Sequence, residues 1–193
     1  MARPREFDAE EALDKAMGLF WAKGYHDSSI RDLVDRTGVN FYGLYGVFEN
    51  KHGLFLAALD RYRDTVTAGL IRELEKADPA LDRIERALTG LLQATRTLDG
   101  YVGCMMCNTA IEMAPHDPVV AAKVDAHTQG LEAAFRATLA EGQAAGDVAP
   151  DRDIDALAEF LTTTIYSIGL LLRSGAGEAR ARRHIRTALA AVA

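Results

Sequence analysis

One stretch, residues 28–55, constrains the fold of this chain more than any other, because it predicts two short helices joined by a tight turn. A serine at its start, Ser28 or Ser29, can cap the first helix with its hydroxyl. The residues that follow place apolar side chains on one helical face: Ile30, Leu33 and Val34. Gly38 then stands where a helix ends and the backbone turns.

The second helix of the pair has an unusual outer surface. Asn40 can cap it, and Leu44 and Phe48 share its inward face. Amide and aromatic groups are left to face outward: Asn40, Phe41, Tyr42 and Tyr45. A helix this short has little reason to exist alone, but as the second helix of a helix-turn-helix it fits the major groove of DNA. Double-stranded DNA is therefore the first partner that the sequence predicts.

A longer helix is predicted before this pair, and another directly after it. Asp8 can cap the preceding helix, with Glu11 three residues further on, and Gly24 ends it. Its apolar stripe is dense: Leu13, Ala16, Met17, Phe20 and Trp21. Lys51 begins a further helix that runs toward Leu74. The helices before Lys51 can together close a small core.

At this point the chain resembles a known family. The segments FWAKGY, SSIRDLVDRTGV and LYGVFENKHGLF, in this order, are similar to the DNA-binding region of the TetR/AcrR family of transcriptional regulators. The resemblance implies an all-α fold, with an N-terminal three-helix helix-turn-helix DNA-binding domain at residues 1–50. It also implies a C-terminal helical ligand-binding and dimerisation domain at residues 51–193. In this family the protein binds operator DNA as a homodimer, and its C-terminal domain binds an inducer.

The resemblance also implies which residues touch the operator. Tyr45 and Lys51 match positions that contact the DNA backbone, while Phe41, Tyr42 and Gly43 match base-facing positions. The chain departs from the family pattern just after them, where glycine and valine stand in place of the commoner His or Tyr, so the operator sequence is not readable. The predicted DNA-binding residues are Ser29, Arg31, Asn40, Phe41, Tyr42, Gly43, Tyr45 and Lys51.

Charge bears on the same question. Lys51 stands at a helix start, where a cation opposes the helix dipole and a phosphate partner would explain it. Arg31, opposite the apolar face of its helix, can reach a guanine edge or a phosphate, or pair with Asp35 one turn further on. The chain as a whole has a net charge of −6, which weakens non-specific binding to phosphates. Arg3 and Arg5 form either a short basic arm or a solvated tail.

Composition favours a cytoplasmic protein without a membrane span. Hydrophobic residues make up 49% of the sequence, enough for a helical core and an interface. No stretch resembles a signal peptide, and the apolar run at residues 165–172 is too short to cross a bilayer. The two cysteines suggest a reducing compartment. We expect no cofactor, and we find neither a metal cluster nor the nucleophile–base pair that an enzyme would need.

The C-terminal part is predicted to be helical throughout. Helices are expected at residues 81–98, 104–113, 118–146, 154–172 and 178–192, with a break at residues 99–103. The stripe from Ile154 to Leu172 has more apolar surface than one subunit is expected to bury. In the family, the last two long helices pack against their symmetry mates. The resemblance therefore implies a dimer interface that includes Leu157, Leu161, Ile165 and Ile168.

A few polar side chains among these apolar stripes predict an effector site, since a small-molecule pocket needs this mixture. The candidates are Cys104, Cys107, Asn108, Ile111, His127 and Tyr166. Inert core cysteines and a satisfied core histidine are the simpler interpretation. The spacing Cys104-Met-Met-Cys107 also allows a thiol with a lowered pKa, as in a redox or electrophile sensor. Zinc would need further ligands, and His116 is the nearby candidate.

The sequence thus predicts a homodimeric DNA-binding regulator. The favoured mechanism is a repressor that a small-molecule inducer releases from a palindromic operator. Two alternatives stay open: a thiol-based redox or electrophile sensor that uses Cys104 and Cys107, and a helical enzyme that does not bind DNA.

Overall fold

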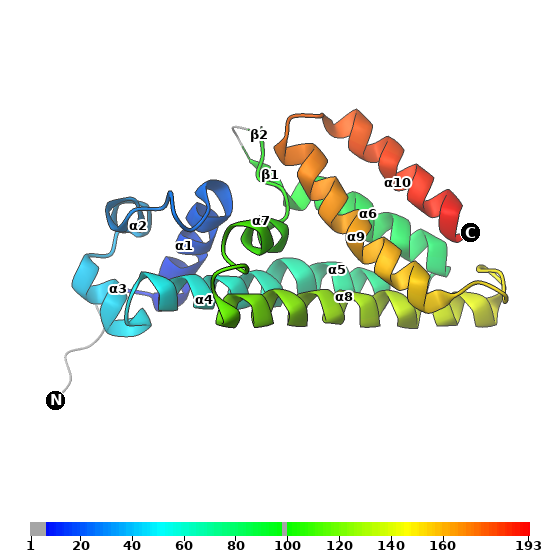
Figure 1. Ribbon diagram of the computed structural model, residues 1–193, viewed down its shortest axis with the longest axis horizontal. Helices are drawn as coiled ribbons and strands as arrows, with labels where there is room; N and C mark the ends of the chain where they lie inside the picture. Colours follow the sequence, from blue (N-terminus) through cyan, green and yellow to red (C-terminus); the bar gives the residue numbers. More distant parts are fainter. Residues whose placement is uncertain (1–6, 98–99) are drawn as a thin grey trace.

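Three short helices form the end of the molecule that is blue to cyan in Figure 1. The computed structural model describes residues 7–97 and 100–193. The helices are α1 (Ala9–Lys23), α2 (Ile30–Thr37) and α3 (Phe41–Phe48). Because α1 packs against α2 and against the helix that follows α3, the α2–α3 pair lies on the outside of this end. This arrangement confirms the predicted helix-turn-helix.

Side-chain caps fix where these helices begin. The carboxylate of Asp8 accepts hydrogen bonds from the backbone N–H groups of Glu10 and Glu11. Ser29 starts α2 with a reciprocal cap: its hydroxyl oxygen accepts the N–H of Asp32 at 3.1 Å, and the Asp32 carboxylate accepts the N–H of Ser29 at 2.9 Å. Both caps were predicted, with Ser29 rather than Ser28 as the capping residue of α2.

Glycines end α1 and α2. Gly24 and Gly38 have φ angles of 90° and 74°, a region that glycine adopts without steric penalty. The buried residues of α2 are Leu33 and Thr37. Ile30 was predicted to share their inward face, but it is 43% exposed, because it is the first residue of the helix and the core covers only the later turns.

One long helical segment joins this end of the molecule to the rest. It consists of α4 (Lys51–Tyr62), η1 (Arg63–Thr67) and α5 (Ala68–Leu74), which follow one another without a break. The prediction of a helix from Lys51 toward Leu74 is therefore confirmed. Within η1 the backbone hydrogen bonds are of the wider π type, and such bulges are frequent at functional sites.

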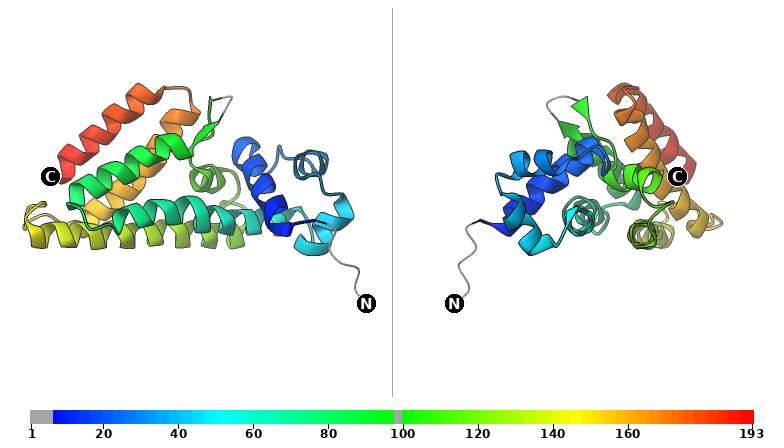
Figure 2. Two further views of the ribbon diagram at one scale, coloured as in Figure 1. Left: turned by 180° about the vertical axis from the view of Figure 1, so that it is seen from behind. Right: turned by 60° about the vertical axis from the view of Figure 1, so that its left-hand side comes forward.

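The remaining helices form the rest of the molecule, as the left view in Figure 2 shows. They are α6 (Ala80–Ala94), α7 (Met105–Glu112), α8 (Pro118–Ala145), α9 (Ile154–Arg173) and α10 (Glu178–Val192). The predicted bounds of α7 to α10 are confirmed to within about two residues. In particular, α8 starts with Asp117 as cap and Pro118 in its first turn, and it ends at Gly146.

The helix that was predicted to reach residue 98 ends earlier, at Ala94. Beyond it, β1 (Arg96–Thr97) and β2 (Gly100–Tyr101) pair as antiparallel strands. The chain turns back here because the N–H of Val102 donates to the carbonyl of Thr95 at 3.0 Å. Within the described residues, β-strands are limited to this short pair, so the all-α class is confirmed.

Two clusters of buried side chains fill the molecule. One is built from α5, α6, α8, α9 and α10. The other joins Phe20 and Leu33 of the helix-turn-helix end to Met105 of α7 and to the first turn of α8. The second cluster thus crosses the predicted boundary between residues 1–50 and 51–193. As a result, α7 packs as part of the same core as the DNA-binding helices.

The structure corrects the predicted dimer interface. Leu161, Ile165 and Ile168 are at most 3% exposed in the single chain, and Leu157 is half-buried. The side chains of Leu161, Ile165 and Ile168 belong to the subunit's own core, so a partner cannot cover them, whereas Leu157 only packs against this core and stays partly exposed. Among the described helices, α9 has the length and apolar composition to cross a membrane, and its packing in this core accounts for that composition.

Candidate DNA interface and effector cavity

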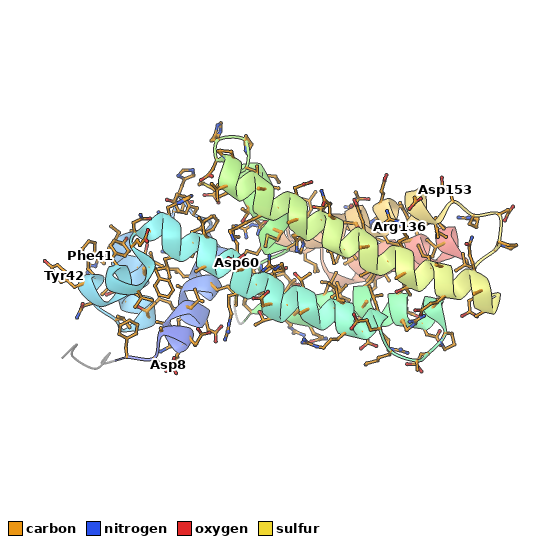
Figure 3. All side chains as sticks on the ribbon, turned by 90° about the horizontal axis from the view of Figure 1, so that it is seen from below. Asp8, Phe41, Tyr42, Asp60, Arg136 and Asp153 are labelled. Atoms are coloured by element: carbon orange, nitrogen blue, oxygen red, sulfur yellow. The ribbon has the colours of Figure 1, made fainter. Side chains whose placement is uncertain are left out.

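The recognition helix α3 presents two large aromatic side chains to solvent. Tyr42 is 85% exposed and Phe41 43%, and Figure 3 shows both at the tip of the molecule, at the opposite end from the label of Asp153. Asn40 caps the helix by accepting the N–H of Gly43 at 2.9 Å. The Phe41 ring lies against the ring of Tyr45, with centroids 4.4 Å apart. A capped first turn thus holds exposed aromatic edges where they can contact base methyl groups.

Two predicted DNA-contact residues do not face outward. Tyr45 is half-buried, and its hydroxyl is buried with no hydrogen-bond partner within the described ranges. A Cβ at Gly43 would lie 2.8 Å from Cγ1 of Val39, so this position faces the module's own core. The outward orientation predicted for both residues is therefore corrected. The rotation of a two-turn helix about its axis is set by packing, which the sequence pattern does not reveal.

Lys51 begins α4, as predicted. Its Nζ lies 4.4 Å from the centroid of the Tyr25 ring, and burial lowers the pKa of its ammonium group. The cation thus rests on an aromatic face at a helix start, where the dipole opposes it. A phosphate at this position would remove that conflict.

Ser29 and Arg31 lie at the exposed start of α2. The hydroxyl of Ser29 is engaged in the cap with Asp32. The guanidinium of Arg31 lies 3.7 Å from the carboxylate of Asp35, and both side chains are largely exposed. The pairing foreseen as the alternative role of Arg31 is thus present. An exposed pair of this kind contributes at most about 1 kcal/mol, so Arg31 can exchange it for a phosphate at little loss.

A carboxylate ties α7 to the turn between α1 and α2. Glu112, the last residue of α7, accepts the backbone N–H groups of Tyr25 at 3.0 Å and His26 at 2.7 Å. The approach is close: a Cβ at Gly24 would lie 2.6 Å from this carboxylate. Helix α7 of the C-terminal part therefore holds the turn between α1 and α2, directly before the helix-turn-helix pair.

We expect Glu112→Ala to release this turn. Hydrogen bonds to a charged group contribute about 1.5–3 kcal/mol, so amide hydrogen exchange at Tyr25 and His26 should accelerate roughly 10- to 100-fold. Glu112→Gln keeps an acceptor at the same place and should lie between the two. Unchanged exchange at both amides in the alanine variant would show that the contact does not form in solution.

Two further hydrogen-bond donors, on Trp21 and Arg173, connect α1 to the segment before α7 and to the end of α9. Nε1 of Trp21 donates to the carbonyl of Gly103 at 2.7 Å in a buried site. Nη1 of Arg173 donates to the carbonyls of Trp21 at 3.2 Å and of Val102 at 2.9 Å. Arg173 is the last residue of α9, and it sits at the C-terminal end of α1, where a cation is favourable. Helix α9 thus extends from the C-terminal bundle to the DNA-binding end.

A small internal cavity lies where η1, α8 and α9 meet the start of α7. Its volume is about 10 Å³, and its lining residues are Tyr62, Val66, Thr67, Leu70, Leu91, Cys104, His127, Leu131 and Ile165. A space of this size holds about one water molecule, so an organic ligand would need the surrounding side chains to move. It brings together Cys104 and His127 of the predicted effector residues.

His127 is the polar group of this cavity. It is 3% exposed, and its Nδ1 lies 3.3 Å from the hydroxyl of Thr67. Its Nε2 is buried and has no hydrogen-bond partner in the described part of the chain. Burial, and to a lesser extent the charge of Arg63, lowers the pKa of His127 to about 4, so the imidazole is neutral at pH 7. The sequence pointed to His127, but not to Tyr62 or Thr67, whose helix was read only as a connector.

The other four predicted effector residues lie outside the cavity. The amide of Asn108 donates to a backbone carbonyl at 3.1 Å, and the hydroxyl of Tyr166 lies 2.6 Å from that of Thr128 on α8. Cys107 is half-buried on α7. Ile111 is 72% exposed, so a pocket-lining role for it is wrong; it occupies the solvent face of α7.

Burial decides the acidity of both thiols. Cys104 directly precedes the first turn of α7, where the helix dipole alone would lower its pKa. The thiol is buried beside the hydroxyl of Tyr62, however, and this burial raises its pKa. Burial also raises the pKa of Cys107. Burial of Cys104 thus opposes the lowered pKa that the spacing allowed for the first thiol, and it agrees with the simpler interpretation of an inert core cysteine.

A larger hollow opens to solvent between η1–α5 and α6; we call it the α5–α6 groove. Its volume is about 460 Å³, and its walls are Thr65, Val66, Gly69, Leu70, Glu73, Arg86, Ala87, Gly90, Leu91 and Ala94. The groove shares Val66, Leu70 and Leu91 with the inner cavity, so these side chains separate the two spaces. The sequence pattern does not reveal this groove, because its walls come from helices that only the fold brings together.

Protein-family models match both parts of the chain. "Bacterial regulatory proteins, tetR family" matches residues 12–58, and "Tetracyclin repressor-like, C-terminal domain" matches residues 80–189. The HTH-type transcriptional repressor ComR of Escherichia coli (strain K12) is 36% identical over 178 residues, which cover 90% of this chain and 83% of ComR. The uncharacterized HTH-type transcriptional regulator YezE of Bacillus subtilis (strain 168) is 30% identical over 190 residues, 98% of each chain.

A solved structure has the same fold along the whole chain. It is a cysteine mutant of the TetR family transcriptional regulator CifR, complexed with 26 bp double-strand operator DNA. The two share 26% sequence identity and a TM-score of 0.89, with 100% of each chain covered. Together with the helix-turn-helix and its exposed recognition helix, these similarities establish that the chain belongs to the TetR family of DNA-binding transcriptional regulators.

Proposed function

We propose that this protein is a cytoplasmic, homodimeric repressor that a small molecule releases from a palindromic operator. The observation that carries the DNA-binding part is the exposed pair Phe41 and Tyr42 in the capped first turn of α3, at the tip of the molecule. Repression is supported by the name of its relative ComR, and DNA as the partner by the operator complex of CifR.

A two-fold dimer would place two recognition helices roughly 34–36 Å apart, one turn of DNA. The exposed side of α9 supports such a dimer, because Phe160 is 38% and Leu170 60% exposed there. Beside it, a hollow of about 500 Å³ lies between α9 and α10. Large apolar side chains on a hollowed surface are typical of protein interfaces. This face replaces the buried residues as the proposed contact.

A salt-dependent gel shift on the DNA upstream of the chain's own gene tests the function. The expected result is binding at nanomolar to micromolar concentration that weakens steeply as salt rises, since phosphate contacts release counterions. Turnover of a substrate together with a lack of DNA binding would instead support the helical enzyme.

We expect Lys51→Ala to weaken binding to all DNA sequences by a similar factor. Lys51 is proposed to contact phosphate, which positions the protein without reading bases. The slope of log affinity against log salt should therefore become shallower by about 0.9, the value for one phosphate. Lys51→Arg should restore most of the affinity. A changed sequence preference with an unaltered salt slope would contradict the assignment.

Release of DNA by a ligand is supported by the connection between the walls of the inner cavity and the DNA-binding helices. Its η1 wall continues directly into α4 and so to Lys51. Its α7 wall ends at Glu112, which holds the turn before α2. A ligand can move these elements only by binding one conformation better than the other. Operator DNA must then weaken ligand binding by the same factor.

A thiol-based sensor is the second candidate, with Cys107 as the reacting group. It is favoured by the place of Cys107, half-buried on the helix that Glu112 connects to the DNA-binding end. The raised pKa of the thiol makes it a slow nucleophile at pH 7. Loss of the response to an alkylating agent in Cys107→Ser, with the response to small molecules intact, would establish this second input.

A further inference from the structure

We propose that His127 anchors the effector, and that the effector is an uncharged, mostly apolar molecule with one hydrogen-bonding group. The inference rests on the proposed function, because it names the chemistry of the molecule that would release the operator. The α5–α6 groove would be its way in.

The anchor is an atom that the protein leaves unused. Nε2 of His127 is buried and has no partner among the residues that the structure describes, although buried polar atoms are otherwise hydrogen-bonded as a rule. The ring is held from its other side, where Nδ1 lies 3.3 Å from the hydroxyl of Thr67. Depending on which of these two groups carries the shared proton, Nε2 is a donor or an acceptor. A ligand hydroxyl can satisfy either form.

The surroundings select against charge. Burial lowers the pKa of His127 to about 4, so the ring offers no cation at pH 7. Burial also keeps the phenol of Tyr62 and the thiol of Cys104 protonated, because it raises the pKa of both. An ionised ligand would lose its hydration without gaining a counter-charge here. On the groove walls, the guanidinium of Arg86 is already paired with the carboxylate of Glu73.

The entry route is inferred from the side chains that separate the inner cavity from the α5–α6 groove. The cavity of about 10 Å³ is too small for an organic molecule, but the adjoining α5–α6 groove has about 460 Å³. Of the three side chains between them, Val66 belongs to η1, where the π-type bonding already departs from regular α-helix. Gly90 lies on the other wall, where a Cβ would project into open space with no atom within 4 Å. Displacing Val66 would merge the two spaces beside His127.

Three monosubstituted benzenes test the chemistry on the full-length protein: phenol and toluene, which are equal in size, and the slightly larger benzoate. Phenol carries the hydroxyl, toluene replaces it by a methyl group, and benzoate adds a negative charge. Binding is measured from the imidazole ¹⁵N signals of His127, and operator affinity from fluorescence anisotropy. We expect phenol to shift the Nε2 signal and to bind about 10-fold more tightly than toluene, and benzoate to bind most weakly.

Two variants separate the anchor from the route. His127→Phe keeps a ring but removes Nε2, so binding of phenol should fall to that of toluene while the protein stays folded. Gly90→Leu should block the α5–α6 groove and slow both the binding and the release of the uncharged probes at least 10-fold, as measured from exchange between the free and bound ¹⁵N signals, with operator binding intact. Gly130→Leu is the matched control, because Gly130 also lies within a helix with no atom within 4 Å of a Cβ, but outside the groove walls.

The outcomes distinguish this inference from the function on which it rests. An unchanged preference for phenol in His127→Phe, tighter binding of benzoate, or no ¹⁵N shift with millimolar phenol would each overturn the anchor. If phenol shifts the His127 signal but leaves operator affinity unchanged, the anchor stands and release by a ligand in this cavity fails.

Discussion

Replacing Tyr42 by glutamate is expected to weaken operator binding strongly while leaving the folded protein at least as stable. Tyr42 is 85% exposed, so the fold loses little packing. It is also the second residue of α3, where a carboxylate interacts favourably with the helix dipole and stabilises the fold by about 0.3–1 kcal/mol. On DNA the same carboxylate would enter a groove flanked by negatively charged phosphates, and like charges brought together at an interface cost several kcal/mol. Affinity should therefore fall roughly 10²- to 10³-fold.

Stability should stay the same or rise while operator affinity falls. This combination is easy to interpret, because a misfolded variant would lose stability and binding together. Thermal unfolding and operator anisotropy measure the two effects. Val119→Glu is a matched control: Val119 is the second residue of α8, is 50% exposed and makes the same change of charge. It should bind operator as the native chain does. An unimpaired Tyr42→Glu protein would remove α3 from the DNA interface.

The features that the sequence predicted well are those set by neighbouring residues. Asp8, Ser29, Asn40 and Asp117 cap their helices as expected, because a cap depends on a side chain and N–H groups within three residues of it. Helix ends at glycine follow from the same local geometry. Only the helix expected to reach residue 98 ended early, where a hydrogen bond from Val102 reverses the chain.

The features that the sequence did not predict depend on which helices, or which subunit, pack against a given helix face. Tyr45 and Gly43 turn toward the core because packing fixes the rotation of α3. Leu161 and Ile165 lie on a real apolar stripe, but periodicity cannot say whether the same subunit or another one covers it. The inner cavity also depends on tertiary packing, because Thr67 contacts His127 only where the fold places η1 beside α8.

Replacing Leu170 by aspartate is expected to produce folded monomers that no longer hold the operator. Leu170 is 60% exposed in the single chain, and it lines the hollow between α9 and α10 together with Arg180 and Arg183. In one subunit the new carboxylate would lie in water near these guanidinium groups, so the fold should tolerate it. In a two-fold dimer the substitution occurs twice at one interface. There it buries charge where an apolar contact was, which destabilises association by several kcal/mol.

The loss of operator binding should exceed the loss of any single DNA contact. A dimer makes its second half-site contact at a high effective concentration, which contributes roughly 10²- to 10⁴-fold to affinity, and a monomer forfeits this factor. Sedimentation at micromolar concentration and operator anisotropy measure the two effects. Ile111→Asp is the matched control, since Ile111 is 72% exposed on α7 and undergoes the same apolar-to-acidic change; it should remain dimeric. A native chain that sediments as a monomer, or a dimeric Leu170→Asp protein, would show that this face of α9 is not the interface.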